Sequence, residues 1–319
     1  MSTLPVAQKY NLGAFSNLCI ALLAVSFAPI FIRFSETDIG PNATVLNRML
    51  IFCVVFGLGR GLRKLWETWR TSDQESTVST EPVPISTTQW VLLGAVGLVS
   101  VTTLGLWAIS LTYTTVAKSM LLNNLTPVFA SAGSWLFLGK RFDGRFIFGI
   151  AIAVVGALVL GVEDIQVGDA DSLIGDTYAL LSAVFLGTYF LLVEQLRSRF
   201  DSITILLWRC VIGSMLLIPF VWFTEGQLFP SSSIGLLAVL GLGIVSEGLG
   251  QNLLADCMCK FSASFIALFL LLEPIVSALL GWLIFEESLS PITGVGFVII
   301  LGGIYLAQSS DSATQVGSH

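Results

Sequence analysis

Residues 270–287 read LLLEPIVSALLGWLIFEE and place a glutamate beside a proline in the middle of an apolar run. Residues 123–140, which read NNLTPVFASAGSWLFLGK, repeat the pattern. In each stretch a tryptophan follows the proline by eight residues. These pairs are Pro127 with Trp135, and Pro274 with Trp282. We therefore interpret the two stretches as copies of one unit.

The composition is that of a membrane protein. Of the 319 residues, 55% are hydrophobic and 11% are charged, and the mean hydropathy is +0.87. Soluble domains carry about 25% charged residues. The net charge of -6 and the scattered lysines and arginines exclude a nucleic-acid partner, which would require a clustered basic face.

The cysteine and histidine content excludes several kinds of chemistry. The five cysteines have no regular spacing that would indicate a disulfide framework, so free thiols are expected. The single histidine is His319, the last residue, which leaves the interior without histidine for metal binding or general-base catalysis. The sequence has no nucleotide-binding motif. We expect no enzyme activity, no cofactor and no metal site.

The apolar windows predict an all-α membrane protein with ten transmembrane helices. A bilayer core about 30 Å thick needs about 20 apolar residues in helical conformation, and the alternation typical of a membrane barrel is absent. The windows are 12–32, 42–62, 90–112, 115–138, 144–162, 173–194, 202–223, 232–256, 262–284 and 291–309.

The windows group into two units of five helices. We expect a short cytoplasmic segment, a first repeat that contains one long polar connection, a second repeat and a disordered tail. Their ranges are 1–11, 12–162 with the connection 63–89, 173–309 and 310–319.

Constant offsets relate the two units. Adding 147 to numbers in helices three to five of the first unit aligns Pro127 with Pro274, Trp135 with Trp282, Gly149 with Gly296, Gly156 with Gly303, Gly94 with Gly241 and Ala108 with Ala255. For the first two helices the offset is 161, which places Arg48 on Arg209. Because five is odd, the second unit must enter the membrane from the opposite face. Inverted repeats of this kind expose a central site alternately to each side, as in transporters.

The basic residues predict the orientation. With the N-terminus in the cytoplasm, eleven of the fifteen lysines and arginines fall on the cytoplasmic side. They are Lys9, Arg60, Arg63, Lys64, Arg70, Lys140, Arg141, Arg145, Arg197, Arg199 and Lys260. We expect a multi-pass protein of a bacterial-type inner (plasma) membrane with both termini in the cytoplasm.

Two segments carry a resemblance to a known family. They are FSASFIALFLLLEPIVSALLGWLIFEESLSPITGVGFVIILGGIYLA (261–307) and VAKSMLLNNLTPVFASAGSWLFLGKRFDGRFIFGIAIAVVGALVLG (116–161). With them the chain resembles the drug/metabolite transporter superfamily, specifically the EamA type with two tandem five-helix domains. The resemblance implies export or exchange of small polar metabolites, amino acids or related solutes, through a cavity lined chiefly by helices 1, 3, 4, 6, 8 and 9. The family's acid at the end of helix 4 is matched by Glu287 but replaced by Lys140 in the first copy, and Lys118 stands where a small or apolar residue is usual.

Glu273 is the first candidate for a site residue. An ionised carboxylate in mid-membrane costs at least about 2.5 kcal/mol, so it should face the bundle interior or water. It could bind and release a proton during transport. Alternatively, as a neutral acid, it could hydrogen-bond carbonyls freed by Pro274, which lacks an N–H group.

Helix 4 offers further candidates. Thr126 replaces the acid of the second copy, and Asn123 and Asn124 add amides that could bind a substrate or a neighbouring helix. Lys118 could extend to the lipid headgroups or hold an anionic substrate, with Glu247 opposite.

Helix 8 carries the strongest polar stripe. Glu247 and Gln251 lie at i, i+4 and so on one face, with Asn252 and Asp256 beside them. Because such groups are too costly to face lipid, we expect Glu247 and Gln251 to line the cavity. Asp256 is expected to pair with Lys260 at i, i+4.

The remaining candidates lie on helices 6, 1 and 3. Tyr178, Ser182 and Tyr189 form a stripe that is either core or cavity lining; Asn17 is the repeat equivalent of Tyr178, and Trp107 either closes on a ligand or packs between helices. The equivalent arginines of helices 2 and 7 are interpreted as anchors that pair with carbonyls or headgroups, and stay outside the predicted binding set.

The leading hypothesis is a secondary carrier in the lipid bilayer that moves a small polar solute, with proton coupling through Glu273 or Glu247. Glycines on helices 5 and 10 allow close helix contact and could also support a homodimer. Two other classes remain: a membrane enzyme acting on a lipid-linked substrate, and a signalling or scaffold protein.

Overall fold

A computed structural model describes residues 12–71, 86–113, 119, 122–161, 170–285, 291–310 and 312. Every element of these residues is helical, as predicted. Seven helices are long and apolar enough to cross a membrane: Gly13–Ser35, Pro41–Leu62, Thr87–Trp107, Leu173–Leu196, Ser202–Thr224, Ser233–Cys257 and Ala263–Ile284. Three shorter apolar helices are Thr126–Leu138, Gly144–Val159 and Gly294–Gln308.

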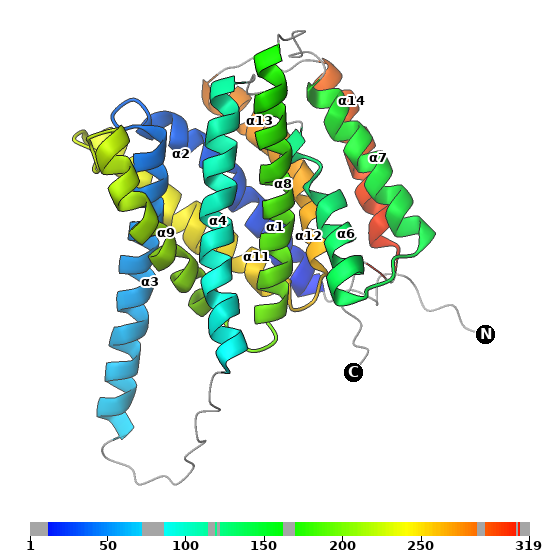
Figure 1. The fold of residues 1–319 in the computed structure, drawn as a ribbon. Coiled ribbons are helices and arrows are strands. Elements are labelled where there is room, and N and C mark those ends of the chain that lie inside the picture. The colour runs from blue at the N-terminus through cyan, green and yellow to red at the C-terminus, as the bar shows by residue number, and fades with distance from the viewer. Residues whose placement is uncertain are drawn as a thin grey trace.

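The helices form one bundle (Figure 1). The first half contains α1 (Leu12–Ser26), α2 (Ala28–Ser35), α3 (Pro41–Thr71), α4 (Thr87–Tyr113), α6 (Thr126–Leu138) and α7 (Gly144–Gly161). The second half contains α8 (Ala170–Leu196), α9 (Ser202–Thr224), α10 (Ser233–Gly241), the π-helix η3 (Leu242–Gln251), α11 (Asn252–Cys257), α12 (Ala263–Phe269), the 3-10 turn η4 (Leu270–Leu272), α13 (Glu273–Phe285) and α14 (Pro291–Gln308).

The proline of the opening stretch has a positional role in the helix. Pro274 is the second residue of α13, and the chain before it tightens into the 3-10 turn η4. Pro127 takes the same place in α6. A proline is favourable in the first turn of a helix, where its missing N–H group would have no helical partner. In each copy a new helix therefore begins one residue before the proline.

Two connections differ from expectation. Helix α3 continues through residues 63–71, which we had placed in the polar connection. Ser310 and Ser312, which we had placed in a disordered tail, hydrogen-bond to the loop before α7: the Ser310 hydroxyl lies 2.5 Å from Asp143 Oδ1, and Ser312 Oγ accepts the Asp143 N–H at 3.1 Å. Burial of the Ser310 side chain fixes this part of the chain against the bundle.

The helix boundaries repeat at the offsets found in the sequence. Helices α6 and α13 both have 13 residues, and α7 and α14 both have 18. Each pair is displaced by 147 positions at both ends, since 126 + 147 = 273 and 144 + 147 = 291. Helices α3 and α9 begin 161 positions apart, since 41 + 161 = 202.

The contacts between helices also repeat when the two halves are interchanged. Helix α7 packs on α14 and α3 packs on α9, and each of these two pairs joins equivalent helices. The pair α4 and α8 corresponds to the contact of α1 with η3 and α11, and the pair α3 and η3 corresponds to α9 and α4. Figure 1 shows α7 beside α14 at one edge and α4 beside α8 at the centre.

Glycines set the distance between α7 and α14. A Cβ atom added to Gly303 would lie 2.5 Å from the backbone nitrogen of Ala153 and 2.6 Å from the carbonyl oxygen of Gly149. A Cβ on Gly156 would lie 2.9 Å from the backbone nitrogen of Ile300. Ala153 and Ile300 are 147 positions apart, so the contact is the same when seen from either half. The predicted close approach of these helices is confirmed.

Gly303→Ala should therefore destabilise the bundle, because the new methyl group meets backbone atoms that cannot rotate away. We expect a loss of about 1–3 kcal/mol, measured as a lower melting temperature in detergent. The matched control is Gly302→Ala, since nothing lies within 4 Å of that added Cβ. Equal melting temperatures for the two variants would contradict the packing described.

Candidate functional site

The most deeply buried charge of the described chain is Glu247. It lies in η3 and its side chain is 0% exposed. Its Oε2 atom accepts a hydrogen bond from Arg48 Nε at 2.5 Å, and its Oε1 atom accepts one from Arg209 Nη1 at 2.6 Å. A single carboxylate thus binds two guanidinium groups, one from α3 and one from α9. Such π-helical turns are frequent at functional sites.

Arg209 is held on several sides. Besides Glu247, its Nε donates to Ser100 Oγ at 2.8 Å, and its Cζ atom lies 5.2 Å from the centre of the Tyr189 ring. Only 8% of the side chain is exposed. The ring face provides a cation–π contact, so this guanidinium has partners in several directions.

The cluster is built from equivalent positions of the two halves. Arg48 and Arg209 are 161 positions apart, and Ser100 and Glu247 are 147 apart. We call these four residues the charge cluster. They come from α3, α9, α4 and η3, so the cluster joins both halves at one point.

This arrangement corrects two expectations. Arg48 and Arg209 pair with a carboxylate and not with carbonyls or headgroups. Glu247, which one hypothesis placed opposite Lys118 at a bound anion, is occupied by the two arginines, and Lys118 lies outside the described residues. The offset of 161 contained part of the missing signal, because it places Arg48 and Arg209 at equivalent positions of the two halves.

Glu273 has different surroundings from Glu247. It is half-buried at the first turn of α13, and within the described part of the chain its carboxyl has no hydrogen bond and no ion pair. The alternative role considered for it, a hydrogen bond to carbonyls freed by Pro274, is therefore not found among these residues.

The first half contributes two buried polar atoms without partners. Trp107 Nε1 in α4 and Asn123 Oδ1 have no hydrogen bond. The Ser110 and Ser119 hydroxyls lie 2.5 Å apart. An unpaired buried donor and an unpaired buried acceptor are costly and suit a polar ligand.

Other predicted residues of the first half have different surroundings. Thr126 is buried, and its hydroxyl donates to the Asn123 carbonyl oxygen at 2.6 Å, so it is satisfied within its own turn. Asn124 is half-buried, and Asn17 in α1 is exposed.

The predicted stripe on α8 divides between packing and the charge cluster. Ser182 Oγ donates to the Thr103 carbonyl oxygen at 3.0 Å and so joins α8 to α4. Tyr178 stacks on Tyr113 with ring centres 6.4 Å apart. Tyr189 instead lies against Arg209, and so belongs to the surroundings of the charge cluster.

The polar stripe predicted within residues 232–256 assumed a regular α-helix, but residues 242–251 form the π-helix η3. Gln251 is half-buried at the end of η3, whereas Glu247 is fully buried. The wider π-helical turn changes the angle between positions i and i+4. Glu247 and Gln251 therefore have different surroundings.

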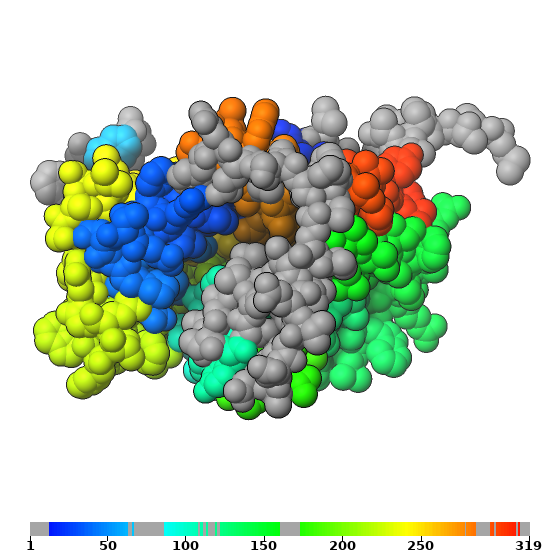
Figure 2. Space-filling model, turned by 90° about the horizontal axis from the view of Figure 1, so that it is seen from above, coloured from blue at the N-terminus to red at the C-terminus, as the bar shows by residue number. Residues whose placement is uncertain are grey.

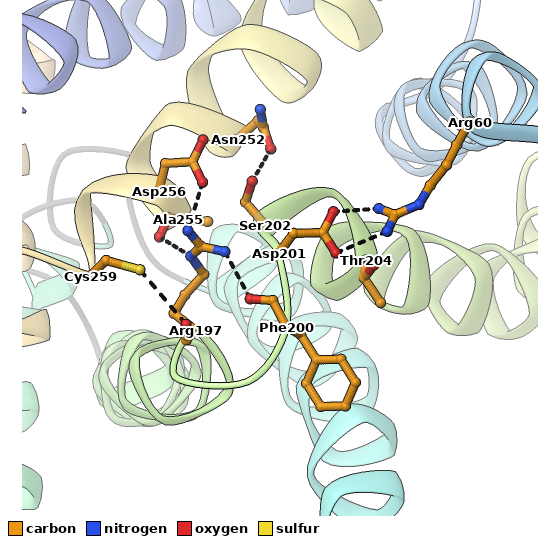
Figure 3. A network of polar contacts seen from close by, with 10 residues as sticks. All are labelled: Arg60, Arg197, Phe200, Asp201, Ser202, Thr204, Asn252, Ala255, Asp256 and Cys259. Atoms are coloured by element: carbon orange, nitrogen blue, oxygen red, sulfur yellow. Dashed lines mark hydrogen bonds and ion pairs between the residues drawn. The ribbon is translucent and has the colours of Figure 1, made fainter. Parts of the chain in front are cut away.

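One end of the bundle, the lower face in Figure 1, carries a polar network around the α8–α9 connection (Figure 3). Arg197 donates to Asp256 Oδ1 at 2.8 Å and to the Ala255 carbonyl oxygen at 3.0 Å. Arg60 of α3 forms an ion pair with Asp201 at the start of α9. The predicted pair of Asp256 with Lys260 is wrong, because α11 ends at Cys257 and the helical i, i+4 spacing does not extend to Lys260.

At the opposite end of the bundle, the upper face, hydrogen bonds join the α2–α3 connection to the α9–α10 connection. Asp38 accepts hydrogen bonds from the Ser231 side chain at 2.6 Å and the Ser232 backbone at 2.7 Å, and these bonds lower the pKa of its carboxyl to about 2. Glu225 accepts bonds from the Asn42 side chain and backbone. Figure 2 shows this face, with the surface of α2 and the start of α3 against that of the α9–α10 connection. The Asp38 tie therefore stays ionised at physiological pH.

A pocket of about 400 Å³ opens on the lower face between the start of α4 and the end of α8. Its lining is Ser86, Thr88, Gln89, Leu92, Gln195, Leu196, Ser198, Arg199 and Phe200. Arg199 is equivalent to Asp38, which lies 161 positions before it. Thr88 is equivalent to Gly235, 147 positions later, whose N–H donates to Ser232 Oγ beside Asp38. The pocket therefore occupies the place that the Asp38 tie fills on the upper face.

Comparison with known proteins identifies the family. The model of the EamA-like transporter family matches residues 13–162 and 173–308. The chain belongs to the EamA-like transporter family. Its relatives are transporters, so it is an integral multi-pass membrane protein and a transporter, not an enzyme.

Several relatives of this EamA-like chain are named. An uncharacterized transporter of Archaeoglobus fulgidus is 21% identical over 91% of this chain and 96% of its own length. The pseudopaline exporter CntI of Pseudomonas aeruginosa is 26% identical over 58% of this chain and 63% of its own. A probable terminal-alkyne amino-acid exporter of Streptantibioticus cattleyicolor is 23% identical over 58% and 62%. The match to each of these two exporters spans less than two thirds of the exporter.

A solved crystal structure shares the fold. It superposes with a TM-score of 0.74 over 93% of this chain and 97% of the other, at 18% identity. The likeness establishes the fold of the EamA-like chain over nearly its whole length.

Glu247→Gln should strongly destabilise the protein, because both guanidinium groups lose their counter-charge inside the bundle. Breaking a buried ion pair costs about 3–5 kcal/mol, which a denaturation series in detergent would measure. The control is the triple variant Arg48→Met, Arg209→Met and Glu247→Leu, which leaves no charge unpaired and should recover much of the loss. A stable single variant would contradict the assigned role of Glu247.

Proposed function

We propose that this EamA-like chain is a secondary carrier that exports or exchanges small polar metabolites, amino acids or related solutes, by alternating access. The observation that carries the proposal is the charge cluster, in which equivalent residues of two halves meet inside an apolar bundle. The names of two relatives, a pseudopaline exporter and a probable amino-acid exporter, support this solute class.

The proposal requires that the two halves be inverted repeats within ten membrane crossings. The repeated helix boundaries support duplication, and the exchange symmetry of the helix contacts supports a two-fold relation. An odd number of crossings in each half then sets the halves in opposite senses. In carriers of this type, substrate binds near mid-membrane at the interface of the repeats.

The difference between the two faces supports alternating access. On the upper face Asp38 seals the start of α10, whereas the equivalent place on the lower face is a pocket beside Arg199. Of these two equivalent places, the one on the upper face is thus closed and the one on the lower face is open. A carrier that exchanges these forms would open each face in turn.

The arrangement of basic residues gives the orientation that we propose. The lower face holds Lys140, Arg197 and Arg199, whereas the α2–α3 and α9–α10 connections of the upper face, residues 36–40 and 225–232, hold no lysine or arginine. The positive-inside rule assigns the lower face to the cytoplasm of a bacterial-type plasma membrane. A homodimer would use other surfaces than the α7–α14 contact, which is internal to one chain.

Proton coupling is assigned to Glu273 and not to Glu247. Glu247 is fixed by two arginines and fully buried, so protonation would break two ion pairs. Glu273 has no such partner and keeps part of its surface accessible. A carboxyl of this kind can load and release a proton without breaking a salt bridge.

Transport by reconstituted vesicles tests the proposal. The purified protein should accumulate at least one amino acid or related polar solute, at a rate that changes with an imposed pH gradient. Glu273→Gln should transport without responding to that gradient, because its amide cannot release a proton. Thr126→Val, at the equivalent position of the first half, is the control and should keep the response. Failure of the wild-type protein to move any solute would refute the proposed function.

A further inference from the structure

We propose that Arg48 binds the carboxylate group of the transported solute. This inference deepens the proposed carrier function and rests on it. It gives a role in substrate binding to a residue that the sequence pattern marked as an anchor, and it limits the solutes to organic carboxylates.

The hydrogen-bond donors of Arg48 are largely unused. Its Nε donates to Glu247, and its two Nη groups have no acceptor among the described residues. Buried guanidinium groups normally find acceptors for most of their N–H groups, in a fork that matches the two oxygens of a carboxylate. The side chain is 17% exposed, about twice the value for Arg209. The free side of the fork is therefore both unpaired and accessible.

Arg209 provides the internal comparison. It occupies the equivalent position, but its N–H groups bind Glu247 and Ser100 and its plane faces Tyr189. The cluster thus treats two equivalent arginines differently. Arg209 is held by two hydrogen bonds and a ring contact, whereas among the described residues Arg48 has the one hydrogen bond to Glu247.

The charges indicate which ligand fits. Two arginines face one ionised carboxylate, Glu247, so one positive charge is left over. This charge of Arg48 is available to a substrate anion. A carboxylate with a single negative charge completes the balance, whereas a phosphate dianion would leave an excess of negative charge in the bundle.

The surroundings strengthen such a pair. Because they are apolar, a charge-assisted pair between Arg48 and a solute carboxylate is stronger there than in water. Binding requires no covalent step.

The test compares an amino acid that the wild-type vesicles transport with its primary amide, which lacks the negative charge. The wild-type protein should prefer the acid by about tenfold or more in apparent affinity, as expected for one charge-assisted hydrogen-bonded pair. Arg48→Gln should lose this preference, and Arg48→Lys should keep part of it, because a lysine has the charge without the fork.

A further variant separates binding from structure. Arg209→Lys, at the equivalent position, should lower the melting temperature but leave the acid-to-amide ratio unchanged. Loss of the ratio in Arg209→Lys, or an unchanged ratio in a folded Arg48→Gln, would overturn the proposal. A wild-type protein that transports acid and amide equally would also overturn it and leave the carrier function intact.

Discussion

A carboxylate in the middle of an apolar bundle must have its charge compensated, and the rest of this structure is arranged around that requirement. Glu247 is sealed from solvent and shares its two oxygens between Arg48 and Arg209. Removing such charges from water costs several kcal/mol for each ion, which only close partners and further hydrogen bonds offset. The requirement brings α3, α9, α4 and η3 together at one place, and these helices come from both halves.

The same requirement separates the roles of the two buried acids. Glu247 is fixed in its ionised form because two arginines hold it. Glu273 begins a helix beside Pro274 and has no ion pair or hydrogen bond among the described residues. In the proposed carrier, Glu247 is the charge that stays and Glu273 is the charge that changes during the transport cycle. The proline creates the break in the helix that places the second acid.

The sequence predicted the large features because they depend on periodicity and composition. Apolar windows gave the helices, and constant offsets gave the repeated boundaries and the Gly149–Gly303 contact. Partner choice was less accessible, because it depends on turns that one-dimensional spacing does not describe. Asp256 was assigned to Lys260 by helical spacing, but the helix ends first and Arg197 reaches it from another connection. The partners of Glu247 lie 199 and 38 residues away, and the offset showed that Arg48 and Arg209 are equivalent without showing which group they bind.

The account depends on the two halves crossing the membrane in opposite senses, and the equivalent positions Thr37 and Ser198 test this directly. Both are exposed, and they lie in the α2–α3 and α8–α9 connections, 161 positions apart. Single cysteines there, in a Cys259→Ser background, would be treated in intact cells with a maleimide that cannot cross membranes. We predict labelling at position 37 from outside and at position 198 only after permeabilisation. Labelling of both positions from the same side would contradict the inverted arrangement and, with it, the proposed carrier.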